Sequence, residues 1–123
     1  MKKEYIITNE ELTARDLNLE NYAIGDAEAN AIILDCIDDC VTLCCSMNDD
    51  FAGKGELAIE EALEKEPYKV SIFKKLQYQM LLCELRTPDE NPLDNIKLQR
   101  IVSHELGWGK INGFQKGVYK GGI

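Results

Sequence analysis

The sequence lacks any long apolar run, which argues against a membrane-spanning helix. No stretch approaches the roughly 18 apolar residues that such a helix needs. The first residues, MKKEYIITNEEL, also lack the apolar segment of a signal peptide. We therefore expect a cytoplasmic protein, made where cysteines stay reduced. The odd count of five cysteines likewise argues against a disulfide framework.

Signatures of catalysis and of cofactor binding are also missing. No motif pairs the single histidine, His104, with a Ser or Cys nucleophile. The segment Gly53-Lys54-Gly55 lacks the upstream glycine and the Ser or Thr of a phosphate-binding loop. A calcium loop beginning at Asn48 fails because Ile59 stands where a bidentate Glu is needed. The sequence therefore predicts a protein that is not an enzyme and that holds no cofactor.

Four of the five cysteines lie in one segment, ILDCIDDCVTLCC, at residues 33–45. On a helical wheel its aspartates gather on one side and its apolar residues on the other. Cys36 and Cys44 would lie about 12 Å apart along a helix, too far to share one zinc ion. Free cysteine packs as a small apolar group. We interpret the segment as a buried helix face rather than a metal or redox site, with core positions at Ile33, Ile37, Cys40 and Cys44.

Helix-start and helix-stop signals predict a mainly α fold, a compact domain of four helices. Thr8 and Glu11 form a capping-box pattern at the first helix. Pro67 suits the first position of the third helix, and Asn91 is expected to cap the fourth. The expected helices span about residues 9–17, 27–47, 67–86 and 92–106, with an extra short acidic helix between residues 55 and 67.

Residues 107–123, GWGKINGFQKGVYKGGI, have a different composition, with six glycines, three lysines and no acidic residue. So many glycines disfavour a helix, yet a flexible linker would not carry this many aromatic side chains. We predict a helical domain at residues 1–106 and an extended arm at 107–123, which docks on its own domain or on a neighbour. The arm residues expected at an interface with another protein subunit are Trp108, Lys110, Phe114, Lys116, Tyr119 and Lys120.

The net charge of −8 is distributed unevenly along the chain. Residues 1–66 hold 5 basic and 17 acidic residues, whereas residues 67–123 hold 9 basic and 5 acidic ones. This division is consistent with solvated surface charge or with head-to-tail contact between copies. We expect charged contacts between a basic stripe with Lys97 and Arg100 and an acidic segment with Glu60 and Glu61. Net acidity argues against nucleic-acid binding by the whole chain.

The predicted helix at 67–86 has two apolar faces, more than a small domain needs to close its core. One face carries Phe73 and Met80, and the other carries Tyr78, Leu81 and Leu85. We expect the arm or another subunit to cover the second face. Tyr78, Leu81 and Leu85 are therefore further candidate interface residues.

The chain combines these patterns in a fixed order: a capped helix with T-x-E-E-L, a long helix opened by an acidic residue, the Pro-started EPYKVSIFKKLQYQMLLCELR, a further short helix and a Gly-rich end. This order resembles that of the head-tail connector proteins of long-tailed bacteriophages, also called adaptor or head-completion proteins. The resemblance spans most of the chain, but it is one of layout. The cysteines and the segment from Trp108 to Tyr119 are not part of it.

The resemblance implies a structural protein of the virion neck, made in the host cytoplasm. Such proteins form rings, commonly of twelve subunits, which dock on the portal protein and meet tail proteins. DNA passes through the lumen of the ring without sequence-specific binding. The principal alternative is a small helical regulatory or inhibitory protein-binding module, and a nucleic-acid accessory protein and an unrecognised enzyme are more remote ones.

Overall fold

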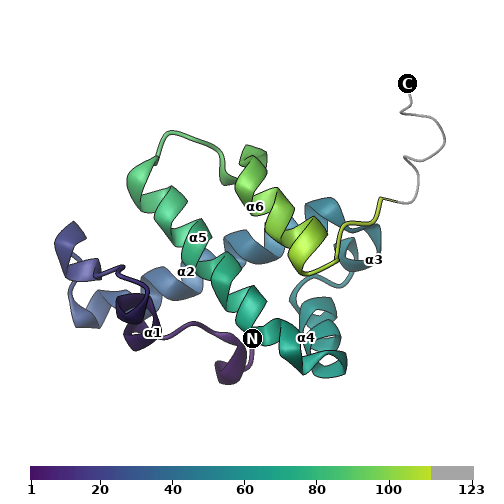
Figure 1. Ribbon diagram of the computed structural model, residues 1–123, viewed down its shortest axis with the longest axis horizontal. Helices are drawn as coiled ribbons and strands as arrows, with labels where there is room; N and C mark the ends of the chain where they lie inside the picture. The colour runs from purple at the N-terminus through teal and green to yellow at the C-terminus, as the bar shows by residue number, and fades with distance from the viewer. Residues whose placement is uncertain (112–123) are drawn as a thin grey trace.

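The computed structural model describes residues 1–111, and within them the chain is mainly helical (Figure 1). Residues 1–111 contain six α-helices, where the sequence predicts four and an extra short acidic helix. The acidic helix is present as α4, and the additional helix is the short α3 between α2 and α4. The α-helices are α1 (Asn9–Ala14), α2 (Asp26–Met47), α3 (Asp49–Ala52), α4 (Glu56–Lys65), α5 (Val70–Arg86) and α6 (Ile96–Arg100). The shorter turns are η1 (Lys3–Tyr5), η2 (Leu19–Tyr22), η3 (Pro67–Lys69), η4 (Pro92–Asp94) and the π-helical η5 (Ile101–Glu105).

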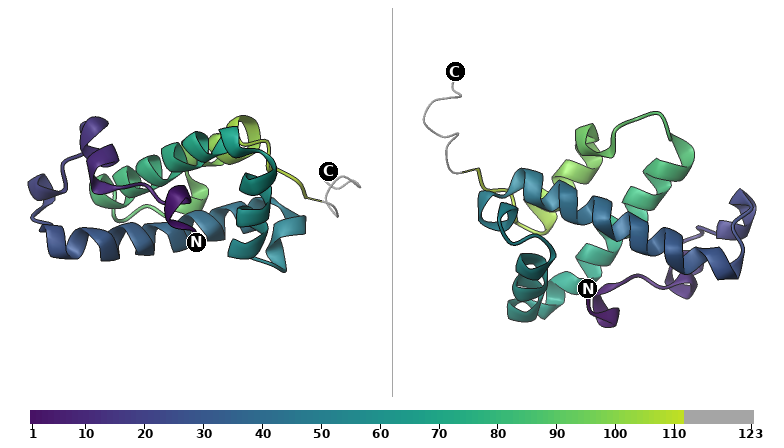
Figure 2. Two further views of the ribbon diagram at one scale, coloured as in Figure 1. Left: turned by 90° about the horizontal axis from the view of Figure 1, so that it is seen from below. Right: turned by 180° about the vertical axis from the view of Figure 1, so that it is seen from behind.

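The helices form two layers (Figure 2). The long helix α2 makes one layer, and α5 and α6 cross it to make the other. The short helices α3 and α4 lie near the carboxyl end of α2, and α1 and η2 lie near its amino end. At 22 residues α2 is about 33 Å long. It therefore sets the long axis of the molecule and separates two ends with different surfaces.

Side-chain caps explain most of the helix starts. Thr8 and Glu11 form the expected capping box at α1, with both reciprocal hydrogen bonds present. Asn48 accepts hydrogen bonds from the backbone at the start of α3. The prediction for the fourth helix was wrong in detail, because Asn91 caps only the η4 turn. Asn95 caps α6, which continues as η5 to Glu105.

The core lies between the two layers and holds the helix face that the sequence predicts. Ile33, Ile37, Cys40 and Cys44 of α2 are all buried, with Cys40 and Cys44 fully so. Opposite them, α5 and the α6–η5 helix contribute their largest fully buried side chains. These are Phe73, Leu76, Met80, Leu81, Leu98, Ile101 and Leu106.

The chain before α1 packs against α5 through Gln77, whose side chain is buried. The Nε2 of Gln77 donates to the carbonyl oxygen of Tyr5 at 2.7 Å, and its Oε1 accepts from the N–H of Ile7 at 2.9 Å. The carbonyl oxygen of Gln77 accepts from the Sγ of Cys36 at 3.4 Å. Gln77 therefore joins the amino-terminal segment, α5 and α2 at one point.

Candidate interaction surfaces

The cysteines of α2 are packed as apolar side chains. Burial raises the pKa of both Cys40 and Cys44, so their thiols stay protonated at neutral pH. Cys45 is only half-buried, and its Sγ contacts the carbonyl oxygen of Phe51 at 3.5 Å. Among residues 1–111, no group of three or more His, Cys, Asp or Glu side chains is placed to hold a metal ion. The described cysteines thus contribute packing and weak hydrogen bonds rather than an arranged ligand set.

A pair of carboxyl groups lies where α2 crosses α5. Burial and a hydrogen bond with Asp39 raise the pKa of Glu84 to about 8. The nearby charge of Asp35 acts in the same direction, whereas a hydrogen bond with Cys36 opposes it. Two carboxylates at close range disfavour double ionisation, so this pair retains a proton at neutral pH. The sequence contains Asp39 and Glu84 but does not show that their side chains lie close together in the fold.

The amino-terminal segment covers part of the second apolar face of α5, which the sequence assigns to the arm or another subunit. The hydroxyl of Tyr78 donates to the carbonyl oxygen of Arg15 at 3.2 Å, and the Arg15 guanidinium lies 5.5 Å from the Tyr78 ring centroid. Leu81 is only 2 % exposed. Leu85 is half-buried and packs against the core. This corrects the assignment of Leu81 as an interface residue and leaves Tyr78 and Leu85 only partly accessible.

The acidic helix α4 already has partners within its own chain. Glu60 accepts a hydrogen bond from the backbone N–H of Lys2 at 2.8 Å. Glu61 lies 3.5 Å from the Nζ of Lys54, and Glu64 pairs with the side chain of Lys2. Glu60 and Glu61 are therefore not the unpaired acidic pole that the charge distribution along the sequence suggested.

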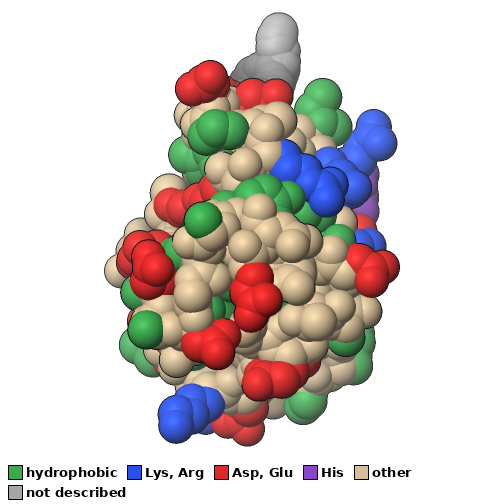
Figure 3. Space-filling view, turned by 90° about the vertical axis from the view of Figure 1, so that its left-hand side faces the viewer, with side chains coloured by type: hydrophobic (Ala, Val, Ile, Leu, Met, Phe, Trp, Pro, Cys, Tyr) green, Lys and Arg blue, Asp and Glu red, His purple; other side chains and the backbone are tan. Residues whose placement is uncertain are grey.

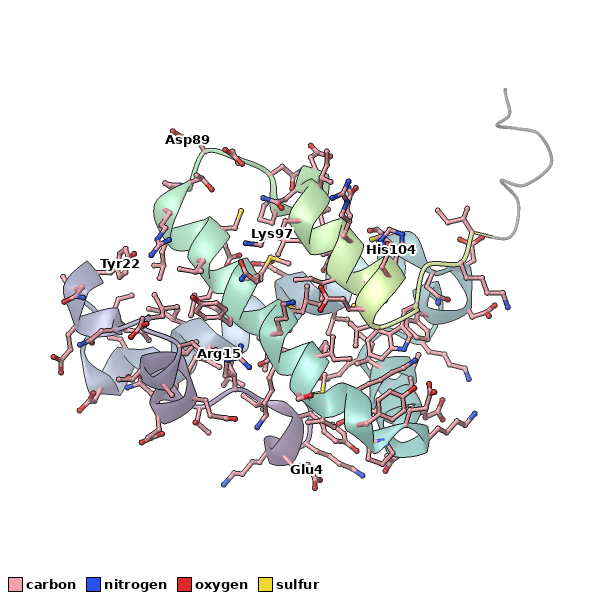
Figure 4. All side chains as sticks on the ribbon, viewed as in Figure 1. Glu4, Arg15, Tyr22, Asp89, Lys97 and His104 are labelled. Atoms are coloured by element: carbon pink, nitrogen blue, oxygen red, sulfur yellow. The ribbon has the colours of Figure 1, made fainter. Side chains whose placement is uncertain are left out.

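The basic stripe on α6 and η5 holds Lys97 and Arg100, which the sequence assigns to charged contacts, together with His104. All three side chains are exposed on one continuous helix, on which Figure 4 labels Lys97 and His104. None of them forms an ion pair with any residue between 1 and 111. By contrast, Lys75 of α5 pairs with Glu105 at 2.8 Å. The stripe therefore presents positive charge that the described part of the chain does not neutralise.

Unpaired acidic residues gather at the opposite end, around the starts of α1 and α2. Glu10, Asp26 and Glu28 are exposed, and none forms an ion pair within the described range. Figure 3 views this end, where acidic side chains are spread over the surface and basic ones lie toward its rim. Sequence reasoning missed this surface because α4 has the denser acidic run. The scarcity of Lys and Arg between residues 4 and 53, where Arg15 stands alone, was the available signal.

The first residues of the predicted arm belong to the domain. Trp108 is 5 % exposed, and its ring centroid lies 5.4 Å from that of Phe51 and 6.1 Å from that of Phe73. The N–H of Lys110 donates to the carbonyl oxygen of Met47 at 2.8 Å, and its Nζ lies 2.7 Å from Asp50. Trp108 is therefore a core residue and not the exposed interface residue expected, and the packed domain continues past residue 106 to Lys110.

The remaining arm residues assigned to an interface are Phe114, Lys116, Tyr119 and Lys120, and they lie outside the described residues. Within residues 1–111, every helix is too short or too polar to span a lipid bilayer. No protein-family model matches the chain, and neither the curated proteins nor the solved structures contain a match to it.

Proposed function

We propose that this protein is a structural, non-enzymatic subunit of a phage neck, a head-tail connector or adaptor. In this proposal the subunits form a ring, commonly of twelve, between the portal and the tail. The ring docks on the portal protein, and DNA passes through its lumen without sequence-specific contacts. The protein is made in the host cytoplasm and ends in the virion neck.

One observation carries the proposal: a single chain presents two unpaired surfaces of opposite charge. The basic stripe of Lys97, Arg100 and His104 lies on the α6–η5 helix, and the acidic surface with Glu10 and Asp26 lies around the starts of α1 and α2. A contact between unlike surfaces uses each of them once per subunit, and repetition of that contact closes a ring when the rotation permits. Opposite charges on the two surfaces favour this pairing over contacts between like surfaces.

The order of the helices also supports the proposal. A short capped helix precedes a long helix that begins with Asp26, and a Pro-started helical segment follows. This is the order on which the resemblance to connector proteins rests. Because that resemblance is one of layout, the charged surfaces supply the more specific argument.

Imaging of the native particle tests the proposal. We expect copies in a closed ring between portal and tail, with a lumen wide enough for duplex DNA. Reversal of the stripe by Lys97→Glu with Arg100→Glu should weaken the ring, and added salt should weaken the unmodified ring in the same direction. Lys65→Glu is the matched control, because Lys65 is an exposed cation on α4, away from the stripe. Particles that lack the protein at the neck would exclude a connector.

The same experiment addresses the alternative function, a small helical regulatory or inhibitory protein-binding module. Such a module forms a closed two-fold dimer or a small heterocomplex rather than a ring. A two-fold dimer whose stability is unaffected by the reversal at Lys97 and Arg100 would favour this alternative.

A further inference from the structure

A groove runs between the segment around η1 and α1 and the first turns of α2. Its volume is about 630 Å³. Ile7 and Ile33 are almost fully buried beneath it, and Ile6 is half-buried at its side. Leu34 lies along it with 52 % of its surface exposed. The groove thus offers apolar surface that the described chain leaves uncovered.

Negative charge surrounds this apolar surface. Glu10 lines the groove from α1, and Asp26 lines it from the first turn of α2. Both side chains belong to the unpaired acidic surface defined above. Lys3 is the single cation among the lining residues found in the described chain. An occupant should therefore be apolar in part and carry positive charge.

The carboxyl-terminal residues 112–123, NGFQKGVYKGGI, have this chemistry. They contain two lysines, no acidic residue, and the apolar or aromatic side chains of Phe114, Val118, Tyr119 and Ile123. Twelve residues in an extended conformation span at most about 40 Å. This is long enough to lie along a groove on a neighbouring molecule.

The geometry of α2 argues against docking of the whole segment on its own chain. Lys110 is hydrogen-bonded to Met47 at the carboxyl end of α2, whereas the groove lies along the amino-terminal part of that helix. From Met47 back to Leu34, the nearest lining residue of α2, the helix rises about 20 Å. Phe114 follows Ile111 by three residues and can extend only about 10 Å from it. The Phe114 side chain therefore does not reach the groove of its own molecule.

We propose that the groove binds residues 112–123 of a second copy of this chain. Phe114 and Tyr119 would contact the apolar surface beside Leu34, and Lys116 and Lys120 would face the acidic residues around it. This contact joins opposite ends of two molecules, so it deepens, and rests on, the head-to-tail assembly proposed above. Residues 112–123 of one molecule and the groove beside Leu34 of the next form this contact.

Sedimentation velocity of full-length variants tests this pairing. Leu34→Arg places a charge on the apolar surface, and we expect it to raise the dissociation constant for self-association about tenfold or more. The tail variant Phe114→Ser with Tyr119→Ser should have the same effect. Leu57→Arg is the matched control, because Leu57 is 58 % exposed on α4 and lies outside the groove, and it should change the constant by less than about twofold.

Mixing the two defective variants identifies the contact as one between molecules. The Leu34→Arg chain retains an intact tail, and the tail variant retains an intact groove, so the mixture should form one-to-one complexes that neither variant forms alone. Absence of this complex would overturn the proposal. So would an equal effect of Leu34→Arg and Leu57→Arg, or a wild-type chain that stays monomeric at millimolar concentration.

The mixing experiment tests the groove contact, and imaging of the native particle tests the connector function. Each can fail while the other succeeds. Complementation in the mixture together with particles that lack the protein at the neck would retain the groove contact and reject the connector. A ring at the neck whose subunits show no complementation would retain the connector and reject the groove contact.

Discussion

The Oε1 atom of Gln77 accepts a hydrogen bond from the backbone N–H of Ile7, 70 residues earlier in the chain, at 2.9 Å. Gln77 is only 1 % exposed, and its amide nitrogen also donates to Tyr5. A buried backbone group that loses its partner costs free energy, because water cannot replace the bond. This side chain therefore holds the amino-terminal segment, which forms one wall of the groove, against α5.

Replacing Gln77 by Leu should lower the free energy of unfolding by about 2–3 kcal/mol, because it leaves the backbone groups of Tyr5 and Ile7 unsatisfied. Urea denaturation followed by circular dichroism measures this loss. Gln79→Leu on the same helix is the control and should cost less than about 0.5 kcal/mol, since Gln79 is half-buried and its side chain makes no hydrogen bond in residues 1–111. Equal effects at the two positions would contradict the role given to Gln77.

Trp108→Ala should lower the free energy of unfolding by about 3–5 kcal/mol, because it removes a large buried side chain that packs on Phe51 and Phe73. Ile111→Ala should have little effect, since Ile111 is 48 % exposed. Thermal unfolding followed by far-ultraviolet circular dichroism compares the two variants.

Two truncations give an independent measurement of where the domain ends. Removal of residues 112–123 should leave the helical signal and the melting temperature nearly unchanged. Removal of residues 108–123 should lower both, because Trp108 and the hydrogen bonds of Lys110 are lost. The sequence alone instead placed Trp108 and Lys110 in an arm outside the helical domain, among the candidate interface residues. A stable 1–107 chain would show that the arm starts where the sequence placed it.

Stability should fall as the pH rises from about 4.5 toward 8, through the titration of Glu84. Its pKa is raised to about 8 in the folded chain from the ordinary 4.5, so the folded state binds the proton more tightly than the unfolded state. The stabilisation is complete below pH 4.5 and is lost as the pH approaches 8. Glu84 is only half-buried, so solvent screening reduces the effect to about 1 kcal/mol.

Glu84→Gln should remove this pH dependence and raise the melting temperature at pH 8, because glutamine fills the same space without a second charge beside Asp39. Melting curves at several pH values for the wild type and the variant measure the difference. Glu90→Gln is the control, since Glu90 is exposed in the segment between α5 and η4. A wild-type slope that persists in Glu84→Gln would assign the pH dependence to other groups.

Cys40→Ala should lower the free energy of unfolding by about 1 kcal/mol or more, because the fully buried thiol leaves a cavity. Cys45→Ala should cost less, since Cys45 is half-buried. Chemical denaturation under reducing conditions measures both losses. Metal analysis of the purified protein gives a separate test, and one tightly held zinc or iron ion per chain would contradict the packing role of the cysteines.

Local patterns in the sequence were sufficient to predict most of the individual helices. The capping box at Thr8, the apolar face of residues 33–44 and the proline at 67 each act over a few residues, and each predicted its element correctly. The start of the fourth helix was wrong because two Asn residues, Asn91 and Asn95, lie four apart, and each caps the turn that follows it. Which of them begins the longer helix depends on how Leu98 and Ile101 pack, and this is a tertiary property.

The sequence by itself determined the mainly helical class, the buried cysteine face and the exposed basic stripe, because these follow from helical periodicity and side-chain polarity. Only the tertiary structure decided which charges stay unpaired, since Lys2 and Lys54 meet α4 through the fold and leave the start of α2 as the open acidic surface. It also decided that Trp108 belongs to the core. A Gly-rich segment has no periodicity to reveal its partners, and Trp108 is buried because Phe51 and Phe73 come together from two other helical segments.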